Sequence, residues 1–427
     1  MRRTLVCAIQ IGTSRICSAA AWRDQFGNYE IAAIETESAR GCVRKGCIVD
    51  IEAAATIIKS LVTKLSNRVK GDDCRGIDAA YVGVNALSMH NHPYSPSIVL
   101  EEGKSVKSDI LADLRQESLQ YHLQGYDVLG TEVKGYTLDG IDCLNPTGRT
   151  GRQLVAHHQL IVAQQRIRFA VRSAMTKAGV KLMGIIATPL TVGNILTPEE
   201  KQNGCLLVDI GHSLTSVSIY HSGSLQHLAT IPLGGNAVTM DIASKDIPLE
   251  EAEEMNIRQK ELEIVSRCRY EEIIYNVLNQ ILISGNKDRL AAGCVLTGGA
   301  SLQSGLVSLF GERLGINRIM ARGYSGISFG LSDRKPQLSA LTSMVGQCVL
   351  DCEKKEEETS VESKPVTEKP VEEIKEVKQT EEQKQQEQKP KTEEKETVST
   401  GYEVKRPGSV RTGLGRFFKD LLSGQDE

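Results

Sequence analysis

The first 350 or so residues alternate between two hydrophobic patterns. Short apolar runs, such as residues 5–11 and 79–84, are typical of buried strands. Residues 51–69 instead repeat apolar side chains at helical spacing, at Ile57, Ile58, Leu61, Val62 and Leu65. The same patterns predict helices at 166–178 and 270–283 and strands at 205–210, 215–220 and 294–297. Strands that alternate with helices indicate an α/β fold.

This pattern ends abruptly near residue 350. Residues 351–400 contain sixteen acidic residues and ten lysines, with no aromatic residue and no glycine. Such a segment buries too little apolar surface to offset its conformational entropy, so we expect residues 351–405 to be a disordered acidic linker. A solvated single helix is the alternative, but Pro365, Pro370 and Pro390 interrupt it.

Residues 406–427 return to a helical pattern, with apolar side chains at i, i+3, i+4, i+7 and i+8 and a basic fringe. This pattern is typical of an amphipathic helix that lies in a membrane interface and binds anionic lipids. The expected membrane-binding residues are Leu414, Arg416, Phe417, Phe418, Lys419, Leu421 and Leu422. A helix that docks on the protein's own core or on a partner is the alternative, and the long linker favours the membrane.

Composition narrows the function classes. The formal net charge of −3 gives no reason to expect nucleic-acid binding. Eleven scattered cysteines without C-x-x-C spacing are typical of reduced thiols in a cytosolic protein, rather than of disulfides or a zinc site. No apolar run reaches the ~18 residues of a spanning helix. The basic and apolar start resembles a secretory signal, but Gln10, Gly12 and Arg15 interrupt it and favour a strand and turn.

Three glycine-bearing turns follow expected strands. They contain Gly12-Thr13-Ser14-Arg15, then Asp209-Ile210-Gly211-His212-Ser213, and then Thr297-Gly298-Gly299-Ala300. Glycine lets backbone N–H groups approach phosphate oxygens, but it also makes ordinary tight turns. The order is more specific, because two strand–turn–strand hairpins about 200 residues apart, followed by a Thr-Gly-Gly turn, resemble the actin, Hsp70 and sugar-kinase superfamily. In that superfamily two similar domains clamp a nucleotide, the first two turns holding its phosphates and the third its adenosine.

Within this superfamily the chain resembles the bacterial cell-division family FtsA. The stretches that carry the resemblance are residues 231–243, which contain Gly234-Gly235-Asn236, and residues 290–300, 145–148 and 41–50. The amphipathic C-terminal helix is similar as well. The resemblance implies an actin-like two-domain fold of ribonuclease-H-like repeats with an FtsA-type inserted subdomain.

The resemblance also implies a layout along the chain. Domain 1 would span residues 1–84 and return at about 164–203 and 318–350, around an inserted subdomain at 85–163. Domain 2 would span residues 204–317. FtsA proteins carry several dozen more residues near 256–267, in the subdomain that receives the FtsZ tail, so this subdomain is expected to be shortened here.

By the same resemblance, the expected cofactor is ATP with Mg²⁺, and Asp209 is the expected metal-shell carboxylate. The expected nucleotide-binding residues are Gly12, Thr13, Ser14, Arg15, Asp209, Gly211, His212, Ser213, Gly234, Gly235, Asn236, Gly298, Gly299 and Ala300. Lys245 and Glu254 are further candidates for adenosine contacts, and no catalytic residue is assigned. His157 and His158 are interpreted as surface or sheet-edge residues rather than ligands.

The phosphate turns depart from the family pattern. Gln10 stands where the family places an acidic residue, and Arg15 where it places a lysine. The second turn keeps one of three glycines, so His212 and Ser213 carry side chains where backbone should meet phosphate. We therefore expect weak nucleotide binding with little or no turnover.

The implied function is a scaffold that anchors filaments of the tubulin-like protein FtsZ to the cytoplasmic face of the inner membrane. It would help to assemble the division machinery at the midcell septum. Expected partners are the FtsZ C-terminal peptide, other copies of this chain and anionic lipids, although the shortened subdomain argues against a complete FtsZ site.

Two other functions share the superfamily fold. An actin-like adaptor of a pilus-assembly machine is one, and the C-terminal helix argues against it. A small-molecule kinase is the other, but it needs a general base near the second turn, where Thr215 and Ser216 stand.

Overall fold

The computed structural model describes residues 3–354, except 40, 72–73, 102, 244–246, 259–263 and 328–335. The chain divides into two units, Met1–Glu358 and Thr359–Glu427, and all described residues belong to the first. The acidic linker beyond Lys354 and all of the expected membrane-binding residues therefore lie outside the described part of the chain.

The first sheet has the strand order β12-β6-β1-β2-β3. Three strands form an antiparallel meander, and β6 and β12 extend it in parallel beyond β1. The strands are β1 (Thr4–Ile11), β2 (Arg15–Arg23), β3 (Tyr29–Ser38), β6 (Ala79–Val84) and β12 (Lys181–Ala187). The expected strands at 5–11 and 79–84 are confirmed.

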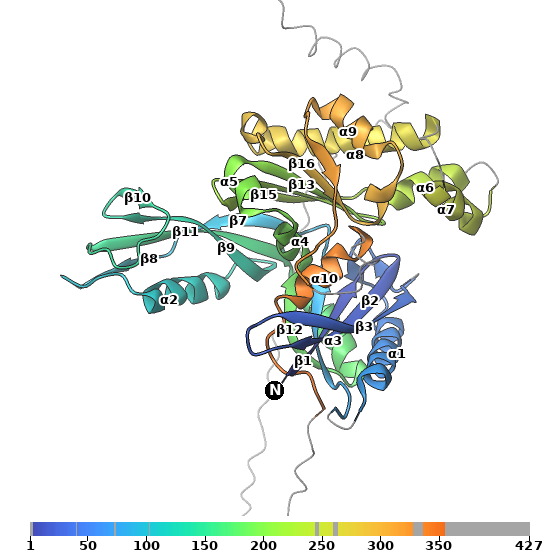
Figure 1. Cartoon of the computed structure of the whole chain (residues 1–427), viewed down its shortest axis with the longest axis horizontal. Coiled ribbons are helices and arrows are strands. Elements are labelled where there is room, and N and C mark those ends of the chain that lie inside the picture. The colour runs from blue at the N-terminus through green and yellow to red at the C-terminus, as the bar shows by residue number, and fades with distance from the viewer. Residues whose placement is uncertain are drawn as a thin grey trace, which may run out of the picture. The chain divides into compact units, whose positions relative to one another are not determined.

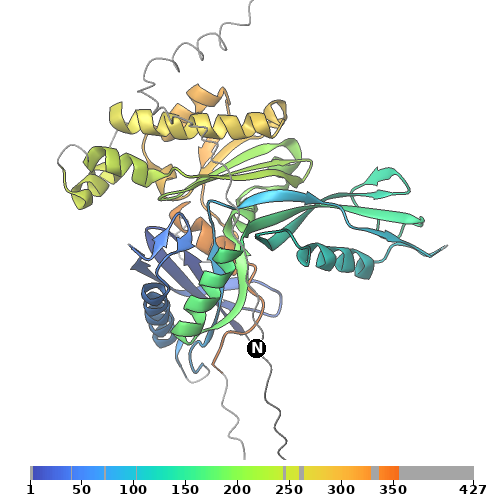
Figure 2. The same ribbon diagram turned by 180° about the vertical axis from the view of Figure 1, so that it is seen from behind.

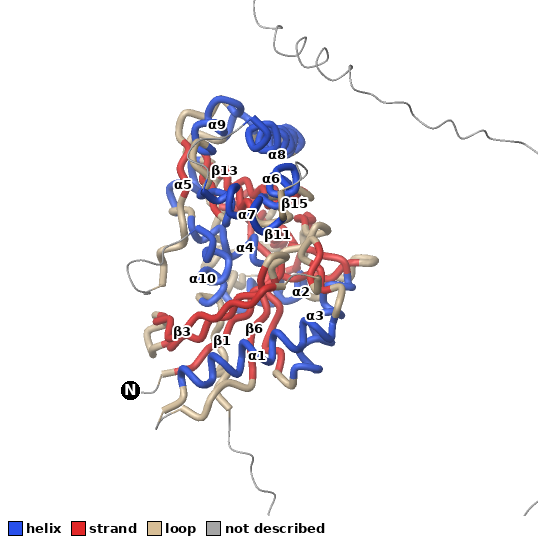
Figure 3. Tube along the Cα trace, turned by 90° about the vertical axis from the view of Figure 1, so that its right-hand side faces the viewer, coloured by secondary structure: helices blue, strands red, loops and turns tan. Residues whose placement is uncertain are grey.

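Helices cover both faces of the first sheet. Figure 2 shows α1 (Ile51–Val69), in blue, beside α3 (Gln165–Ala178), in green, and α10 (Ser339–Val345) packs on β1 and β2 from the other side, as Figure 3 shows. The predicted bounds of α1 are confirmed, because Asp50 caps it by accepting a hydrogen bond from the backbone of Ala53 and its apolar stripe is buried. Burial of that stripe fixes which face of α1 meets the sheet.

The second sheet has the order β15-β14-β13-β16-β17. Its strands are β13 (Cys205–Ile210), β14 (Thr215–His221), β15 (Ser224–Ile231), β16 (Gly293–Thr297) and β17 (Ile319–Ala321). The helices on its outer side are α8 (Ile264–Ile283) and α9 (Leu306–Leu314), and α6 (Gly235–Ala243) and α7 (Leu249–Arg258) lie beside one end of the sheet (Figure 1). The predicted strands at 205–210, 215–220 and 294–297 are confirmed, and the predicted helix at 270–283 begins earlier, at Ile264.

The two sheets repeat one topology. In each, an antiparallel three-strand meander is followed by two strands that lie parallel to its first strand. The β1–β2 and β13–β14 hairpins are therefore equivalent, and Gln10 and Asp209 each lie two residues before the turn glycine, Gly12 or Gly211. The repeat brings the tips of both hairpins to comparable places on their sheets.

A third sheet extends to one side of the first two (Figures 1 and 2). Its elements are β7 (His90–Tyr94), β8 (Ser97–Val99), α2 (Ser108–Leu119), β9 (Tyr126–Leu138), β10 (Ile141–Cys143) and β11 (Gln153–Gln164). The expectation that His158 is a surface residue is wrong. Its side chain is only 2% exposed beneath α2, where it hydrogen-bonds Ser118, and burial there lowers its pKa.

The remaining elements are short. They are β4 (Val43–Arg44), β5 (Cys47–Ile48), α4 (Thr188–Val192), α5 (Pro198–Asn203) and the 3₁₀ turns Gly193–Ile195, Lys287–Arg289, Gly299–Leu302 and Pro336–Leu338. Near 256–267, the described residues are the end of α7 and the start of α8, and none of them forms a strand. Among the helices of the described residues, none is both long enough and apolar enough to cross a bilayer.

The last described residues, 348–354, form a strap along the base of the first sheet. The backbone N–H of Cys352 donates to Leu5 O at 2.8 Å, and its carbonyl accepts from Asp78 N at 3.2 Å. Two residues further, Lys354 N donates to Gly76 O at 2.9 Å. The strap is thus held by β1 on one side and by the segment before β6 on the other.

Candidate nucleotide site

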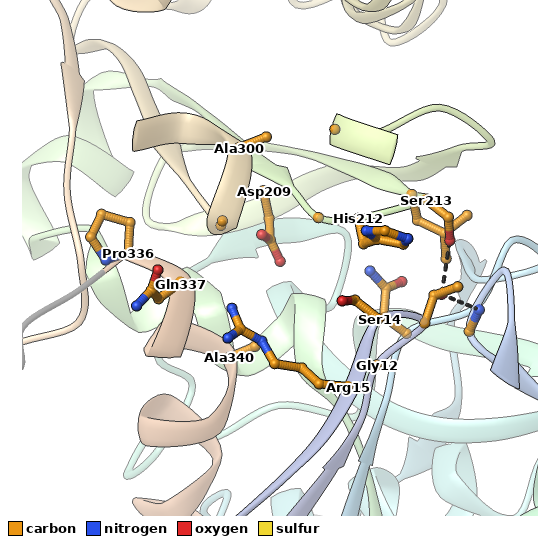
Figure 4. A pocket seen from close by; sticks show the side chains of 18 of the residues that line it. Gly12, Ser14, Arg15, Asp209, His212, Ser213, Ala300, Pro336, Gln337 and Ala340 are labelled. Carbon is orange, nitrogen blue, oxygen red and sulfur yellow. Dashed lines mark hydrogen bonds between the residues drawn. The ribbon is translucent and has the colours of Figure 1, made fainter. Parts of the chain in front are cut away.

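A cavity of about 410 Å³ lies where the two hairpins face each other (Figure 4). All of the expected nucleotide-binding residues line it except Gly234 and Asn236. Three segments that lie far apart in the sequence supply much of the lining: the β1–β2 turn, the β13–β14 turn, and the turn after β16. The three turns that were grouped from the sequence therefore lie around one cavity.

The tips of the two hairpins touch. The Ser213 hydroxyl donates a hydrogen bond to Thr13 Oγ1 at 2.8 Å, and the backbone N–H of Gly46 donates to the same oxygen at 3.3 Å. Figure 4 draws both bonds as dashed lines. Deeper in the site, Asn85 Nδ2 donates to Ser216 Oγ at 2.7 Å and joins the end of β6 to β14. The two sheets are thus hydrogen-bonded directly through side chains at the cavity.

Gly234 and Asn236 hold the second hairpin from behind. The carbonyl oxygen of Gly211 accepts from Gly235 N at 3.0 Å, and that of His212 accepts from Asn236 N at 2.7 Å. A Cβ on Gly234 would lie 2.6 Å from Gly211 O, so only glycine fits there. These two residues position the hairpin through backbone contacts, and they do not line the cavity.

Gly298 packs directly on the end of β13. Its φ is +85°, and a Cβ there would lie 2.4 Å from Asp209 Oδ1 and 2.5 Å from Ile210 O. A side chain at this position would therefore collide with both groups in a backbone conformation that L residues rarely adopt. At Gly299, by contrast, a Cβ would meet nothing within 4 Å. The first glycine of the pair is required by packing, whereas the second leaves open space beside the cavity.

Asp209 is the carboxylate at the centre of the site. Burial raises its pKa from 3.8 to about 6, because a charged carboxylate is poorly solvated there. Arg15 extends toward Asp209 from the first hairpin (Figure 4). The residue of the first sheet that is equivalent to Asp209 is the neutral Gln10. One carboxylate with a cation facing it is a weak metal site on its own, and Mg²⁺ at such sites takes further oxygens from phosphates and water.

Sequence reasoning missed several residues of the lining. They include Asn85, Thr188, Thr239, Asn256, Gln303 and Gln337. Asn256 Nδ2 donates to Gly235 O at 3.3 Å and to Thr239 Oγ1 at 3.0 Å, while its Oδ1 is buried without a partner among the described residues. Single polar residues that stand outside a motif give no signal in the sequence, so only the fold reveals them. Of the two adenosine candidates, Glu254 does not line the cavity, and Lys245 lies outside the described residues.

The cavity has the features that a nucleotide needs. The backbone N–H groups of Thr13, Ser14 and Ser213 donate to no acceptor within the described part of the chain, and clustered N–H groups at turns bind phosphate oxygens. The required glycine at 298 and the open Gly299 leave room for a flat group beside the third turn. No group of three or more His, Cys, Asp or Glu side chains that would suit a metal ion occurs in the described segments.

The fold agrees with a known class. A chain of the solved PilM-PilN type IV pilus biogenesis complex is similar, with a TM-score of 0.52 and 17% identity over 80% of this chain and 98% of the other. Duplicated sheets of this order, with two hairpin tips at one cavity, define an actin-like ATPase fold.

Sequence comparison then narrows the class to a family. The profile of FtsA, described as Cell division protein FtsA, matches residues 206–340. A Cell division protein FtsA from Porphyromonas gingivalis is 26% identical over 83% of this chain and 83% of that relative. Another, from Pseudomonas aeruginosa, is 26% identical over 79% of this chain and 92% of that relative. Along about four fifths of its length the chain is therefore similar to FtsA proteins, as a divergent relative.

Proposed function

We propose that this protein is a cell-division scaffold that anchors FtsZ filaments to the cytoplasmic face of the membrane at the division septum and helps to assemble the division machinery there. The observation that carries the proposal is the likeness to cell-division relatives along about four fifths of the chain. The paired hairpins at one cavity support it, because they retain the clamp of an actin-like protein. Other copies of the chain are expected partners in a filament.

The proposed cofactor is a nucleotide with Mg²⁺. The N–H groups of Thr13, Ser14 and Ser213 would hold phosphates, Asp209 would face the metal, and Gly298 to Ala300 would lie against the nucleoside. When bound, the nucleotide supplies a charged bridge between the two sheets. The side chains of His212 and Ser213 stand among the phosphate donors, so binding is weak and turnover is low or absent.

Membrane binding is assigned to the C-terminal helix on its sequence pattern. Burial of five large apolar side chains contributes roughly 10 kcal/mol. Ordering some twelve residues costs a comparable amount, so one helix binds reversibly. Several copies in one filament bind firmly, because each bound helix raises the effective concentration of the next at the lipid surface. The affinity of the scaffold for the membrane therefore increases when its copies assemble into a filament.

Cosedimentation with anionic liposomes tests the anchor. The full chain is expected to pellet with the vesicles, and a version that ends at Val404 to remain in the supernatant. The double substitution Phe417→Glu and Phe418→Glu should behave like the truncation, whereas Ser423→Glu, outside the apolar stripe, should pellet like the full chain. Equal pelleting of the full and truncated chains would remove the anchor from the proposal.

The same assay tests the partner. FtsZ filaments should pellet with liposomes only when the full chain is present, and a peptide of the FtsZ C-terminus should compete. An adaptor of a pilus-assembly machine is the second candidate, favoured by the likeness of fold to the PilM chain. The result that would favour the pilus-assembly adaptor is FtsZ in the supernatant while the chain itself binds vesicles.

A further inference from the structure

The contact between the hairpin tips falls where two phosphate-binding turns would share a ligand. Ser213 Oγ lies 2.8 Å from Thr13 Oγ1, and the same two turns carry the backbone N–H groups of Thr13, Ser14 and Ser213, which donate to no acceptor among the described residues. A phosphate held by both turns must sit between these donors. The hydroxyl bridge spans that same space.

We infer that the Ser213–Thr13 bridge takes the place of a terminal phosphate and makes this cleft selective for a nucleoside diphosphate over a nucleoside triphosphate. The inference rests on the proposed nucleotide site and names the ligand that the site takes. On this inference, a diphosphate binds to the donors of the turns while the bridge stays closed. A triphosphate must separate the two hydroxyls to place its last phosphate between the turns.

Distances show what that separation requires. A phosphate oxygen that accepts from both hydroxyls makes two contacts of about 2.7 Å, so the hydroxyl oxygens must lie about 5 Å apart. They are 2.8 Å apart here. Thr13 Oγ1 also accepts from Gly46 N, so its movement breaks two hydrogen bonds. In the second turn the backbone is held next to Ser213, because the carbonyl of His212 accepts from Asn236 N.

Further hydrogen bonds oppose opening of the whole cleft. Asn85 Nδ2 donates to Ser216 Oγ at 2.7 Å, and Asn91 Oδ1 accepts from Leu228 N at 2.7 Å. Thr230 Oγ1 donates to Met89 O at 3.3 Å. These contacts tie β14 and β15 to the segment that follows β6, so the hairpin tips cannot separate by a free rotation of one sheet. Selectivity therefore resides in the bridge itself.

Competition binding with the full chain tests the inference. A fluorescent ADP with Mg²⁺ is displaced by ADP or by a non-hydrolysable ATP analogue, and ADP is expected to bind at least about tenfold more tightly. Ser213→Gly removes the bridge and restores a small residue, so it should improve binding of the ATP analogue and bring the ratio to within about threefold. Thr13→Ala removes the bridge from the other side and should shift the ratio in the same direction.

Ser222→Gly is the matched control. It makes the same change in the β14–β15 turn, at a φ of 52° and away from the cavity, so both affinities should stay as in the wild type. Circular dichroism confirms folding of each variant, and if Ser213→Gly does not fold, Thr13→Ala decides.

Equal or tighter binding of the ATP analogue to the wild type would overturn the inference while leaving the nucleotide site intact. An unchanged ratio in both bridge variants would overturn it as well. Failure of both nucleotides to bind at millimolar concentration would overturn the nucleotide site and the inference with it.

Discussion

The β1–β2 and β13–β14 hairpins occupy the same place in two sheets of identical strand order and share a glycine and a serine in their turns, yet their chemistry differs at several other positions near the cavity. Gln10 in the first corresponds to Asp209 in the second, and Cys17 to Ser216. The two turns, residues 12–15 and 211–214, have the same length, but the second carries His212 where the first has Thr13 and Leu214 where the first has Arg15.

The strands of each hairpin hold it in place, whereas the side chains at its tip determine its chemistry at the cavity. Both strand pairs are fixed by backbone pairing and by buried apolar side chains such as Ile9 and Val208, which are 0% exposed. The tips contribute little to this packing, so their side chains can change without loss of the frame. In this chain both hairpins keep the frame of an actin-like fold, while the carboxylate, Asp209, lies on the second hairpin and the cation, Arg15, on the first.

The largest expected effect concerns Gly298, which packs against the Asp209 carboxylate. Gly298→Ala would drive a Cβ into Asp209 and Ile210 in a left-handed conformation. Backbone strain and overpacking together should lower the free energy of unfolding by about 3–5 kcal/mol. Urea unfolding followed by circular dichroism measures it. Gly299→Ala is the control, since its Cβ meets nothing, and a comparable loss in that variant would contradict the explanation.

The next largest effect concerns the negative charge of the Asp209 carboxylate. The folded pKa of Asp209 lies near 6, above its unfolded value of 3.8, so the folded state binds more protons in between. Stability is therefore expected to fall by about 3 kcal/mol as the pH rises from about 4 to about 6, and then to level off.

Asp209→Asn should remove this loss and be more stable than the wild type at pH 7.5. Urea midpoints at pH 4.5, 6 and 7.5 provide the measurement. Asp113→Asn, on the exposed surface of α2, should leave the profile as it is. A profile for Asp209→Asn that still declines toward pH 6 would show that another group is responsible.

The smallest of the three effects concerns the bond between the sheets. Ser216, which stands where the first hairpin has Cys17, accepts from Asn85 at 2.7 Å and is 2% exposed. A double-mutant cycle with Asn85→Ala and Ser216→Ala should give a coupling energy of about 1 kcal/mol. The single variants are expected to lose more than that, because each leaves a buried polar group unpaired. A coupling near zero would mean that the bond does not join the sheets in solution.

Sequence reasoning succeeded where burial dictates the pattern. The bounds of α1 and the strands of both meanders follow from apolar runs that the structure buries, and the turn glycines located three segments of the lining. The sequence did not predict which neighbouring residues face the cavity and which face away from it. Gly234 and Asn236 adjoin Gly235 in the chain, but the start of α6 points them behind the hairpin. Asn256 was missed because its role depends on a helix contact that no local motif records.

The strap at residues 348–354 has a mechanical consequence. Its backbone is bonded to Leu5 on one side and to Gly76 and Asp78 on the other, directly ahead of the long tail. A pull on the tail is therefore transmitted to the strands of the first sheet, and it does not have to unwind α10 first. In a chain held by its tail, the load would therefore enter through the sheet that carries Thr13 before it reached the sheet of Ser213.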